Sequence, residues 1–567
     1  MASGTAIRVD MGRYLAPQRL RYSQVHRETM TGNRTNKNPM AIKLSLPTVA
    51  DSADAGIEIR PVYIEEWVEN LAYATPARLL EQTLTNVSAL NQQPLKAPHR
   101  LKVLDLHIKP YTFALAFRRN QEAAQTSTVL QRQRNVSKGM RLLSTELALG
   151  YKQVLADLMG KKSNFGSSRD MRTALQRASL FCSLSLLHCY DEYRPAHKNI
   201  WREVIALYKY SEKLELHMAP APIPGVADKG FDDCTATLFK RLCLTSLVDP
   251  YHLAYGELWR VYEAFGDYAP AAEIIRITDV QRPAGIFVID PNLDQSPIAF
   301  AQLTSPPAAP CRLLDVNPVL KKLRDHRPAA DTDTGLPSHV LAAMVRALGL
   351  PPKRHTPRES SEGRVVIAVG LSTVHHFLLN GAEPQAAAPA NEDEIEIHAS
   401  PGHNAPRRYS YRSEGWEVAD EGPGGFGLVR DDPPDIPAGA GELVGLNFPQ
   451  RGDDGFSWTI GVVRWVNIGS DNRQQMGIQV LDTSASPITL IVENVTDTIT
   501  RIPRPALALP QLDATRGSTI ISPRGIFAKG SQLRVGGDSR IALIEAHTLS
   551  ESTSSFDRFN YKVMEQN

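Results

Sequence analysis

The spacing of the hydrophobic residues changes part-way along this 567-residue chain, and that change constrains the fold more than any other feature. Between residues 62 and 265 they recur every three or four positions, which places them on one face of an α-helix. After residue 404 they alternate at every second position between glycine-bearing turns, as they do in β-strands. Helices pack in helical layers and strands in sheets, so the two spacings indicate separate domains. We therefore predict a multidomain α+β protein.

The first half of the chain is expected to be helical. Amphipathic helices bury their apolar faces against one another, so residues 50–272 should form an all-helical bundle or array. Thr75-Pro76 predicts a helix start, since threonine is a common N-cap and proline suits the first helical position. A following helical segment is expected to end at Pro110. The apolar face of a later helix comprises Leu175, Ala178, Cys182, Leu186, Cys189 and Tyr193.

Composition divides the rest of the chain. Residues 1–49 carry eight Arg and Lys against two Asp and Glu without apolar periodicity, so we expect a basic, disordered arm, with Met40 as a second plausible start. Residues 273–381 are expected to form a small mixed α/β region with strands near 285–289 and 364–370 and a helix at 340–348. Residues 382–403 are an Ala-, Pro- and acid-rich linker. Residues 404–500 predict an antiparallel β-barrel, and residues 501–567 a second small β domain.

Little in the sequence supports catalysis or metal binding. No Gly-x-Ser-x-Gly, P-loop or zincin helix occurs. Residues 422–427 spell the dinucleotide pattern Gly-x-Gly-x-x-Gly, but no helical pattern follows it, so the Rossmann context is missing. No Cys-x-x-Cys occurs, and His375 and His376 point about 100° apart on a helix and cannot easily chelate one ion. We expect no enzyme, no metal site and no cofactor.

Charge, hydropathy and cysteine content indicate which partners and which compartment to expect. The net charge of +2 gives no global footprint for nucleic acid. No run of eighteen apolar residues and no N-terminal apolar signal region occurs, so we expect no membrane span. The odd number of cysteines, five, favours a reducing compartment over a disulfide scaffold. We therefore expect a cytoplasmic protein.

The residues that carry chemistry open the predicted barrel. Arg407, Arg408 and Arg412 place three guanidinium groups within six residues, and Asp420 opens a turn that contains Gly422 and Gly425. The planar fork of arginine binds phosphate oxygens in pairs, and its face stacks on purine rings. A carboxylate at a strand end can accept hydrogen bonds from guanine, and glycines let the backbone approach a ligand. This set suits a ligand with two phosphates and two guanines.

The arrangement resembles the PilZ domain, a bacterial receptor module for cyclic di-GMP. The family pattern is Arg-Arg-x-x-x-Arg, a short gap, then Asp/Asn-x-Ser-x-x-Gly on a small β-barrel. Arg407, Arg408 and Arg412 match its first part, and Asp420 and Gly425 match the ends of its second. Gly422 stands where the family has serine, so one hydrogen bond to the ligand would be lost. Residues 461–466 and 477–479 look like the late strands of such barrels.

The resemblance implies a cytoplasmic cyclic di-GMP receptor, with ligand contacts from Arg407, Arg408, Arg412, Asp420, Gly422 and Gly425. Ligand binding would order residues 400–412 and change how the helical domain sits against the barrel. The helical domain would then contact a protein partner in motility, pili, adhesion or biofilm control.

Plainer interpretations remain open. The chain can be a ligand-independent interaction scaffold with a degenerate PilZ barrel, and its three arginines a solvated basic run. Nucleic-acid binding is weaker still, since the strands lack interleaved aromatic and basic residues. Arg464 lies in mid-strand between apolar neighbours, which favours a surface-facing or salt-bridged residue over a ligand contact.

Overall fold

The structure is a computed structural model. It describes residues 42–52, 54, 56–119, 127–160, 167–223, 234–277, 283–325, 336–349, 358–380, 411–432, 438–449, 458–492, 503–510, 518–536 and 541–564. The predicted linker 382–403 and most of the predicted basic arm 1–49 lie outside these residues, as do Arg407 and Arg408.

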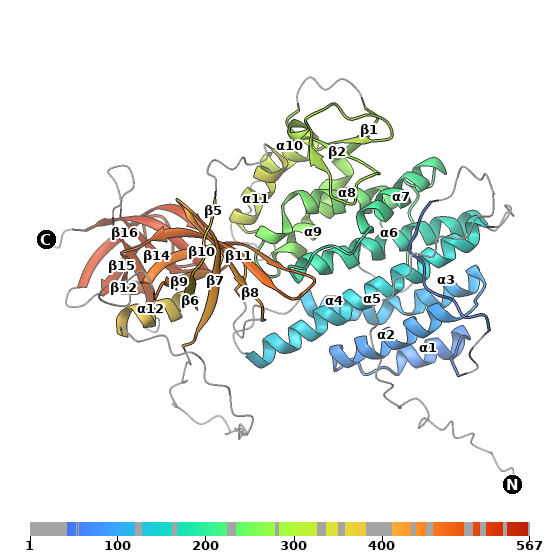
Figure 1. Cartoon of the computed structure of the whole chain (residues 1–567), viewed down its shortest axis with the longest axis horizontal. Coiled ribbons are helices and arrows are strands. Elements are labelled where there is room, and N and C mark those ends of the chain that lie inside the picture. The colour runs from blue at the N-terminus through green and yellow to red at the C-terminus, as the bar shows by residue number, and fades with distance from the viewer. Residues whose placement is uncertain are drawn as a thin grey trace, which may run out of the picture. The chain divides into compact units, whose positions relative to one another are not determined.

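Nine α-helices lie in the described part of the first 272 residues, as the three-to-four spacing predicts (Figure 1). They are α1 (Pro61–Glu69), α2 (Pro76–Gln92), α3 (Ala97–Leu106), α4 (Ile108–Arg119), α5 (Ser127–Met159), α6 (Ser167–Asp191), α7 (Ile200–Lys213), α8 (Thr235–Leu247) and α9 (Glu257–Tyr268). Helix α2 begins at Pro76 after Thr75, as predicted. The prediction of a stop at Pro110 is wrong, because Pro110 lies in the first turn of α4, where its missing N–H group is not needed.

The long helices α5 and α6 form the centre of this helical part. Helix α5 packs along both α6 and α2 (Figure 1). Gly150 of α5 allows the close approach of α2, because a Cβ atom there would lie 2.5 Å from Asn91 Oδ1. Cys182 and Cys189 of α6 are buried, and burial raises the pKa of both thiols to about 12. They are therefore core residues, as their spacing indicated.

A small mixed region follows the helices. Its sheet has the order β1-β4-β2-β3 and contains β1 (Glu273–Ile275), β2 (Ile286–Ile289), β3 (Ile298–Ala299) and β4 (Arg312–Asp315). Helices α10 (Asn317–Asp325) and α11 (Ser338–Leu348) come next along the chain. No helix in the described part of the chain combines the length and apolar character needed to cross a membrane.

A seven-stranded antiparallel sheet comes next, in the order β5-β7-β6-β9-β10-β11-β8. Its strands are β5 (Glu359–Ser360), β6 (Arg364–Val369), β7 (Ser413–Gly422), β8 (Gly425–Arg430), β9 (Leu443–Asn447), β10 (Trp458–Ile468) and β11 (Gln474–Asp482), and helix α12 (Leu371–Asn380) follows β6. Strand β7 also pairs with β8, so the sheet curves back on itself. Strands β5 and β6 fall in the predicted mixed region 273–381 but pair within this sheet, because strand pairing does not follow the position of the linker.

The last six strands form a closed barrel in the order β12-β13-β14-β17-β16-β15. Figure 1 draws this part of the chain in orange and red. They are β12 (Ser486–Val492), β13 (Arg504–Leu509), β14 (Thr519–Pro523), β15 (Gln532–Gly536), β16 (Ile541–Ser552) and β17 (Phe556–Val563). Strand β12 lies within the predicted range 404–500, so this barrel begins earlier than residue 501. The α+β fold class with two β modules is confirmed.

One apolar cluster joins the two β modules. Helix α12 and strands β9 and β10 contribute Val374, Phe377, Leu443, Trp458 and Ile460, and the C-terminal barrel contributes Leu507, Leu509, Ile521 and Phe556. The rings of Phe377 and Trp458 stack with their centroids 5.2 Å apart. A shared core of this kind holds both modules in one arrangement.

We predict that Phe556→Ala destabilises the β modules by about 3–5 kcal/mol, because it removes a fully buried ring from this cluster. Val563→Ala on the same strand is the control, since Val563 is 65% exposed, and it should change stability by less than about 0.5 kcal/mol. Urea denaturation followed by circular dichroism measures both. Equal effects of the two substitutions would contradict the shared core.

Candidate ligand-binding site

The turn between β7 and β8 carries three of the predicted site residues. Asp420 pairs across the two strands with Gly427, and Gly422 pairs with Gly425. A Cβ atom at Gly427 would lie 2.6 Å from the Asp420 carboxylate, so this glycine leaves room for the acid. Residues 425–427 belong to strand β8, so the helix that a Rossmann dinucleotide site requires is not there, as expected.

A hollow of about 260 Å³ lies beside this turn. Its lining includes Gly422, Gly424 and Gly425 from the turn, Arg464 and Trp465 from β10, Gly477, Ile478 and Gln479 from β11, and Arg358. Cationic, aromatic and amide side chains thus surround glycine backbone. An anionic ligand with a planar ring system fits such a surface.

A β-bulge shapes the β10 wall of the hollow. Val463 pairs with Ile478 and Trp465 with Gly477, so Arg464 is one residue more than β11 can match. Regular strands point successive side chains to opposite faces, but this bulge allows both Arg464 and Trp465 to line the hollow. Trp465 fits because residue 477 is glycine: a Cβ atom there would lie 1.9 Å from the Trp465 Nε1 atom.

Arg358 is a site residue that the sequence analysis missed. It precedes β5, and its Nη1 atom donates a hydrogen bond to Asp420 Oδ1 over 2.6 Å. Both side chains are about one-third exposed, so the ion pair lies at the rim of the hollow. The sequence signal was present, since Arg354 and Arg358 have the same spacing as Arg408 and Arg412. Arg354 lies outside the described residues.

The structure does not bring Arg412 to the Asp420 turn. Arg412 is exposed just before β7, whereas Asp420 lies near the other end of that strand. Eight residues of extended chain span about 26 Å. Neighbouring Tyr411 stacks on His376 of α12, with ring centroids 4.0 Å apart.

Arg464 forms contacts in two directions. Its Nε atom donates to Gln479 Oε1 over 2.7 Å, and its Nη1 atom lies 2.6 Å from Glu551 Oε1 of strand β16. Arg464 is a salt-bridged strand residue, as predicted, and it also lines the hollow, which the sequence analysis did not expect. The C-terminal barrel thus supplies a carboxylate to a side chain of the hollow.

The β10–β11 hairpin also contacts the helical part of the chain, through Tyr193 just after α6. The Ile468 amide donates to the Tyr193 carbonyl over 2.8 Å, and the Tyr193 hydroxyl donates to the Leu253 carbonyl over 2.8 Å. Tyr193 is buried in the core of the seven-stranded sheet, and its backbone has a left-handed φ of 54°. The end of α6 is therefore anchored inside the β module.

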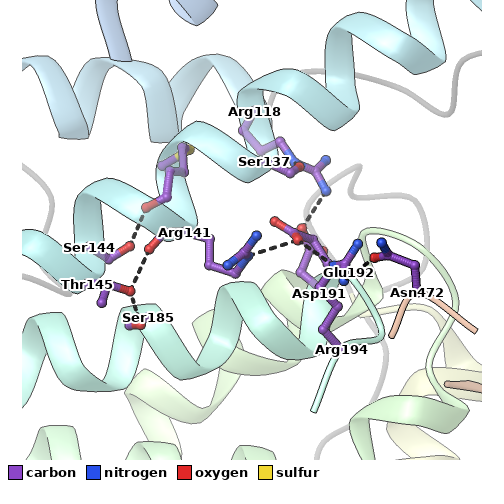
Figure 2. A network of polar contacts seen from close by, with 11 residues as sticks. Arg118, Ser137, Arg141, Ser144, Thr145, Ser185, Asp191, Glu192, Arg194 and Asn472 are labelled. Carbon is purple, nitrogen blue, oxygen red and sulfur yellow. Dashed lines mark hydrogen bonds and ion pairs between the residues drawn. The ribbon is translucent and has the colours of Figure 1, made fainter. Parts of the chain in front are cut away.

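The residues on either side of Tyr193 in the sequence, Glu192 and Arg194, belong to a polar network that Figure 2 shows. Arg194 donates to Asn472 Oδ1 of the hairpin over 3.1 Å and lies 3.3 Å from Glu192 Oε2. Arg141 of α5 donates to the same Glu192 oxygen over 2.9 Å. Burial raises the pKa of Glu192 above its ordinary value, although both arginines act to lower it. The hairpin is thus connected to α5 and α6.

The β module with the arginine- and glycine-lined hollow has the PilZ architecture, and along the chain it lies between a helical part and a second barrel. The chain belongs to the FimW family of cyclic-di-GMP receptors. The FimW N-terminal domain model matches residues 63–279, the middle PilZ domain model residues 286–409 and 382–487, and the C-terminal β-barrel model residues 490–564. The family is one of receptors, in agreement with the prediction that the chain is not an enzyme.

A curated relative spans nearly the whole chain. The "Cyclic-di-GMP receptor FimW" of Pseudomonas aeruginosa strain PAO1 is 24% identical over 592 aligned residues, covering 94% of this chain and 95% of the relative. No solved structure matches the chain. Among the described residues, no group of three His, Cys, Asp or Glu is placed to hold a metal ion.

We predict that Gly477→Ala destabilises the protein by about 1–3 kcal/mol, because the added methyl group overlaps the Trp465 ring and forces it to move. Gly424→Ala is the matched control in the same hollow, since a Cβ atom there meets nothing within 4 Å. Urea denaturation measures stability, and near-ultraviolet circular dichroism reports the tryptophan environment. A stable Gly477→Ala protein with an unchanged spectrum would contradict the close fit.

Proposed function

We propose that this protein is a cyclic di-GMP receptor that binds the dinucleotide at the hollow beside the Asp420 turn. The observation that carries the proposal is the meeting of Arg358, Asp420 and Trp465 around glycine backbone. The hollow is smaller than most pockets for whole ligands, so one guanine and its phosphate would enter it. The rest of the ligand would lie across the rim.

Each group has a role in this proposal. Arg358 would exchange its carboxylate partner for a phosphate, which an arginine fork also binds. Asp420 would then accept hydrogen bonds from guanine N1–H and N2–H, and the Trp465 ring would stack on a base. Gly422 and Gly425 allow close approach, but the missing serine hydroxyl at position 422 costs about 0.5–1.5 kcal/mol, or up to roughly tenfold in affinity.

Two arginine segments compete for the phosphate role. The sequence-based proposal uses Arg407, Arg408 and Arg412, whereas the position of Arg358 beside Asp420 favours residues 354–358. We favour the second segment, because Arg412 lies just before β7, at the end of that strand remote from the turn. Arg407 and Arg408 remain proposed contacts that substitution can test.

The effect of ligand binding would reach the helical domain through the β10–β11 hairpin. Ligand contacts with Trp465 and Gln479 would bias the hairpin, and Tyr193 and Asn472 connect it to the end of α6. The helical domain would then present an altered surface to a protein partner in motility, pili, adhesion or biofilm control. The family membership supports the receptor class, and the process regulated is part of this proposal.

Calorimetry with cyclic di-GMP on the full chain tests the receptor function. The wild type should bind, and Arg358→Ala should weaken binding about tenfold or more, since a charge-assisted contact is lost. Arg408→Ala and Arg412→Ala report on the other segment. Arg473→Ala is the control: it pairs with Asp431 and does not line the hollow, so binding should be unchanged.

If the wild type gives no binding heat at high micromolar cyclic di-GMP, the receptor proposal is wrong. The ligand-independent scaffold with a degenerate barrel would then be the better account. Weakening by Arg412→Ala but not by Arg358→Ala would instead transfer the phosphate role to residues 407–412.

Hydrogen exchange tests the transmission. Saturating cyclic di-GMP should change amide protection at residues 188–194 as well as in the hairpin, because the two are hydrogen-bonded. Asn472→Ala should retain ligand binding but reduce the change at residues 188–194. A ligand effect confined to the β module would contradict transmission through α6.

A further inference from the structure

Arg464 is held at the rim of the hollow by a residue of another module. Its guanidinium contacts Gln479 on one side and Glu551 of the C-terminal barrel on the other. We propose that Glu551 tunes the ligand affinity of the hollow, because its carboxylate and a ligand phosphate compete for the Arg464 guanidinium. This inference rests on the proposed function, since the competing phosphate belongs to cyclic di-GMP.

Both members of the ion pair owe their position to irregular strand pairing. Arg464 is the additional residue of the β10 bulge, which allows it to share the hollow with Trp465. Glu551 follows a register shift between Leu549 and Glu551 in the pairing of β16 with β17. Bulges re-aim side chains next to binding sites. Two such irregularities bring one cation and one anion to the same rim.

The ion pair is not needed to dock the C-terminal barrel. The apolar cluster around Trp458 and Phe556 already joins the two modules. The Ser555 hydroxyl also donates to the Gly441 carbonyl over 2.8 Å. Because the barrel is held by these other contacts, the Glu551 carboxylate stays at the rim when Arg464 leaves it. Its effect therefore falls on the ligand site and not on assembly.

The partial exposure of both side chains lowers the free energy needed for Arg464 to exchange Glu551 for a phosphate. The Arg464 side chain is 37% exposed and that of Glu551 20% exposed, so water screens their attraction. A doubly charged dinucleotide offers phosphate oxygens that suit the same guanidinium fork. The bound state would gain an Arg464–phosphate contact and lose the Arg464–Glu551 contact. The measured affinity depends on the difference in free energy between the Arg464–phosphate contact and the Arg464–Glu551 contact.

Calorimetric titration of four full-length proteins with cyclic di-GMP tests this competition: wild type, Glu551→Gln, Arg464→Ala and the double variant. Glu551→Gln should tighten binding by up to about fivefold, the scale of a partly exposed ion pair. Arg464→Ala should weaken it about tenfold. In the Arg464→Ala background, Glu551→Gln should have no further effect, since the contested group is gone.

Glu545→Gln is the matched control, because Glu545 lies on the same strand β16 but pairs with Gln532 and Lys562. It should leave the affinity unchanged. Glu551→Gln keeps the side-chain shape, and thermal unfolding checks that each variant is folded.

The outcomes separate the inference from the function on which it rests. If the wild type binds and Glu551→Gln binds with the same affinity, the proposed competition is wrong, but the receptor function is retained. Equal tightening by Glu551→Gln with and without Arg464 also overturns it, because general charge repulsion would then be the cause. Failure of all four proteins to bind removes the receptor function and the inference together.

Discussion

The close approach of β8 and β10 to β11 is the constraint on which the hollow depends. A Cβ atom at Gly425 would lie 1.9 Å from the Ile478 carbonyl oxygen, and one at Gly477 would overlap the Trp465 ring. A side chain at residue 425 would push β8 and β11 apart, and one at residue 477 would displace the Trp465 ring. Glycine at both positions therefore brings backbone, tryptophan and arginine to one concave surface. A ligand could reach that backbone directly.

Charge completes the site without fixing it rigidly. Arg358 pairs with Asp420, and Arg464 pairs with Glu551, in both cases at the rim and partly exposed. Exposed ion pairs contribute little to stability, so these arginines can exchange a carboxylate for a phosphate at small cost. Buried groups in the helical part behave differently: Arg118 and Asp191 are almost fully enclosed and form a fixed link between α4 and α6. The ion pairs at the rim can therefore change partners when a ligand binds, whereas the buried pair in the helical part stays formed.

Local patterns predicted the elements but not their long-range pairing. Hydrophobic spacing located the helices and the two β modules, and the Asp420–Gly425 turn was found because its residues are adjacent in sequence. Arg358 was missed because 62 residues separate it from Asp420, and only strand pairing brings them together. The same reason explains why β6 joins the sheet from beyond the linker. Pro110 was misjudged because the helix boundary before it, at His107, carries no strong stop signal.

A crystal structure of the full chain with cyclic di-GMP tests the central claim most directly. The account predicts a guanine beside Trp465 and Asp420, with phosphate oxygens within hydrogen-bonding distance of Arg358. Ligand bound at the Arg412 end of β7, or at a surface remote from the glycine turn, would contradict it.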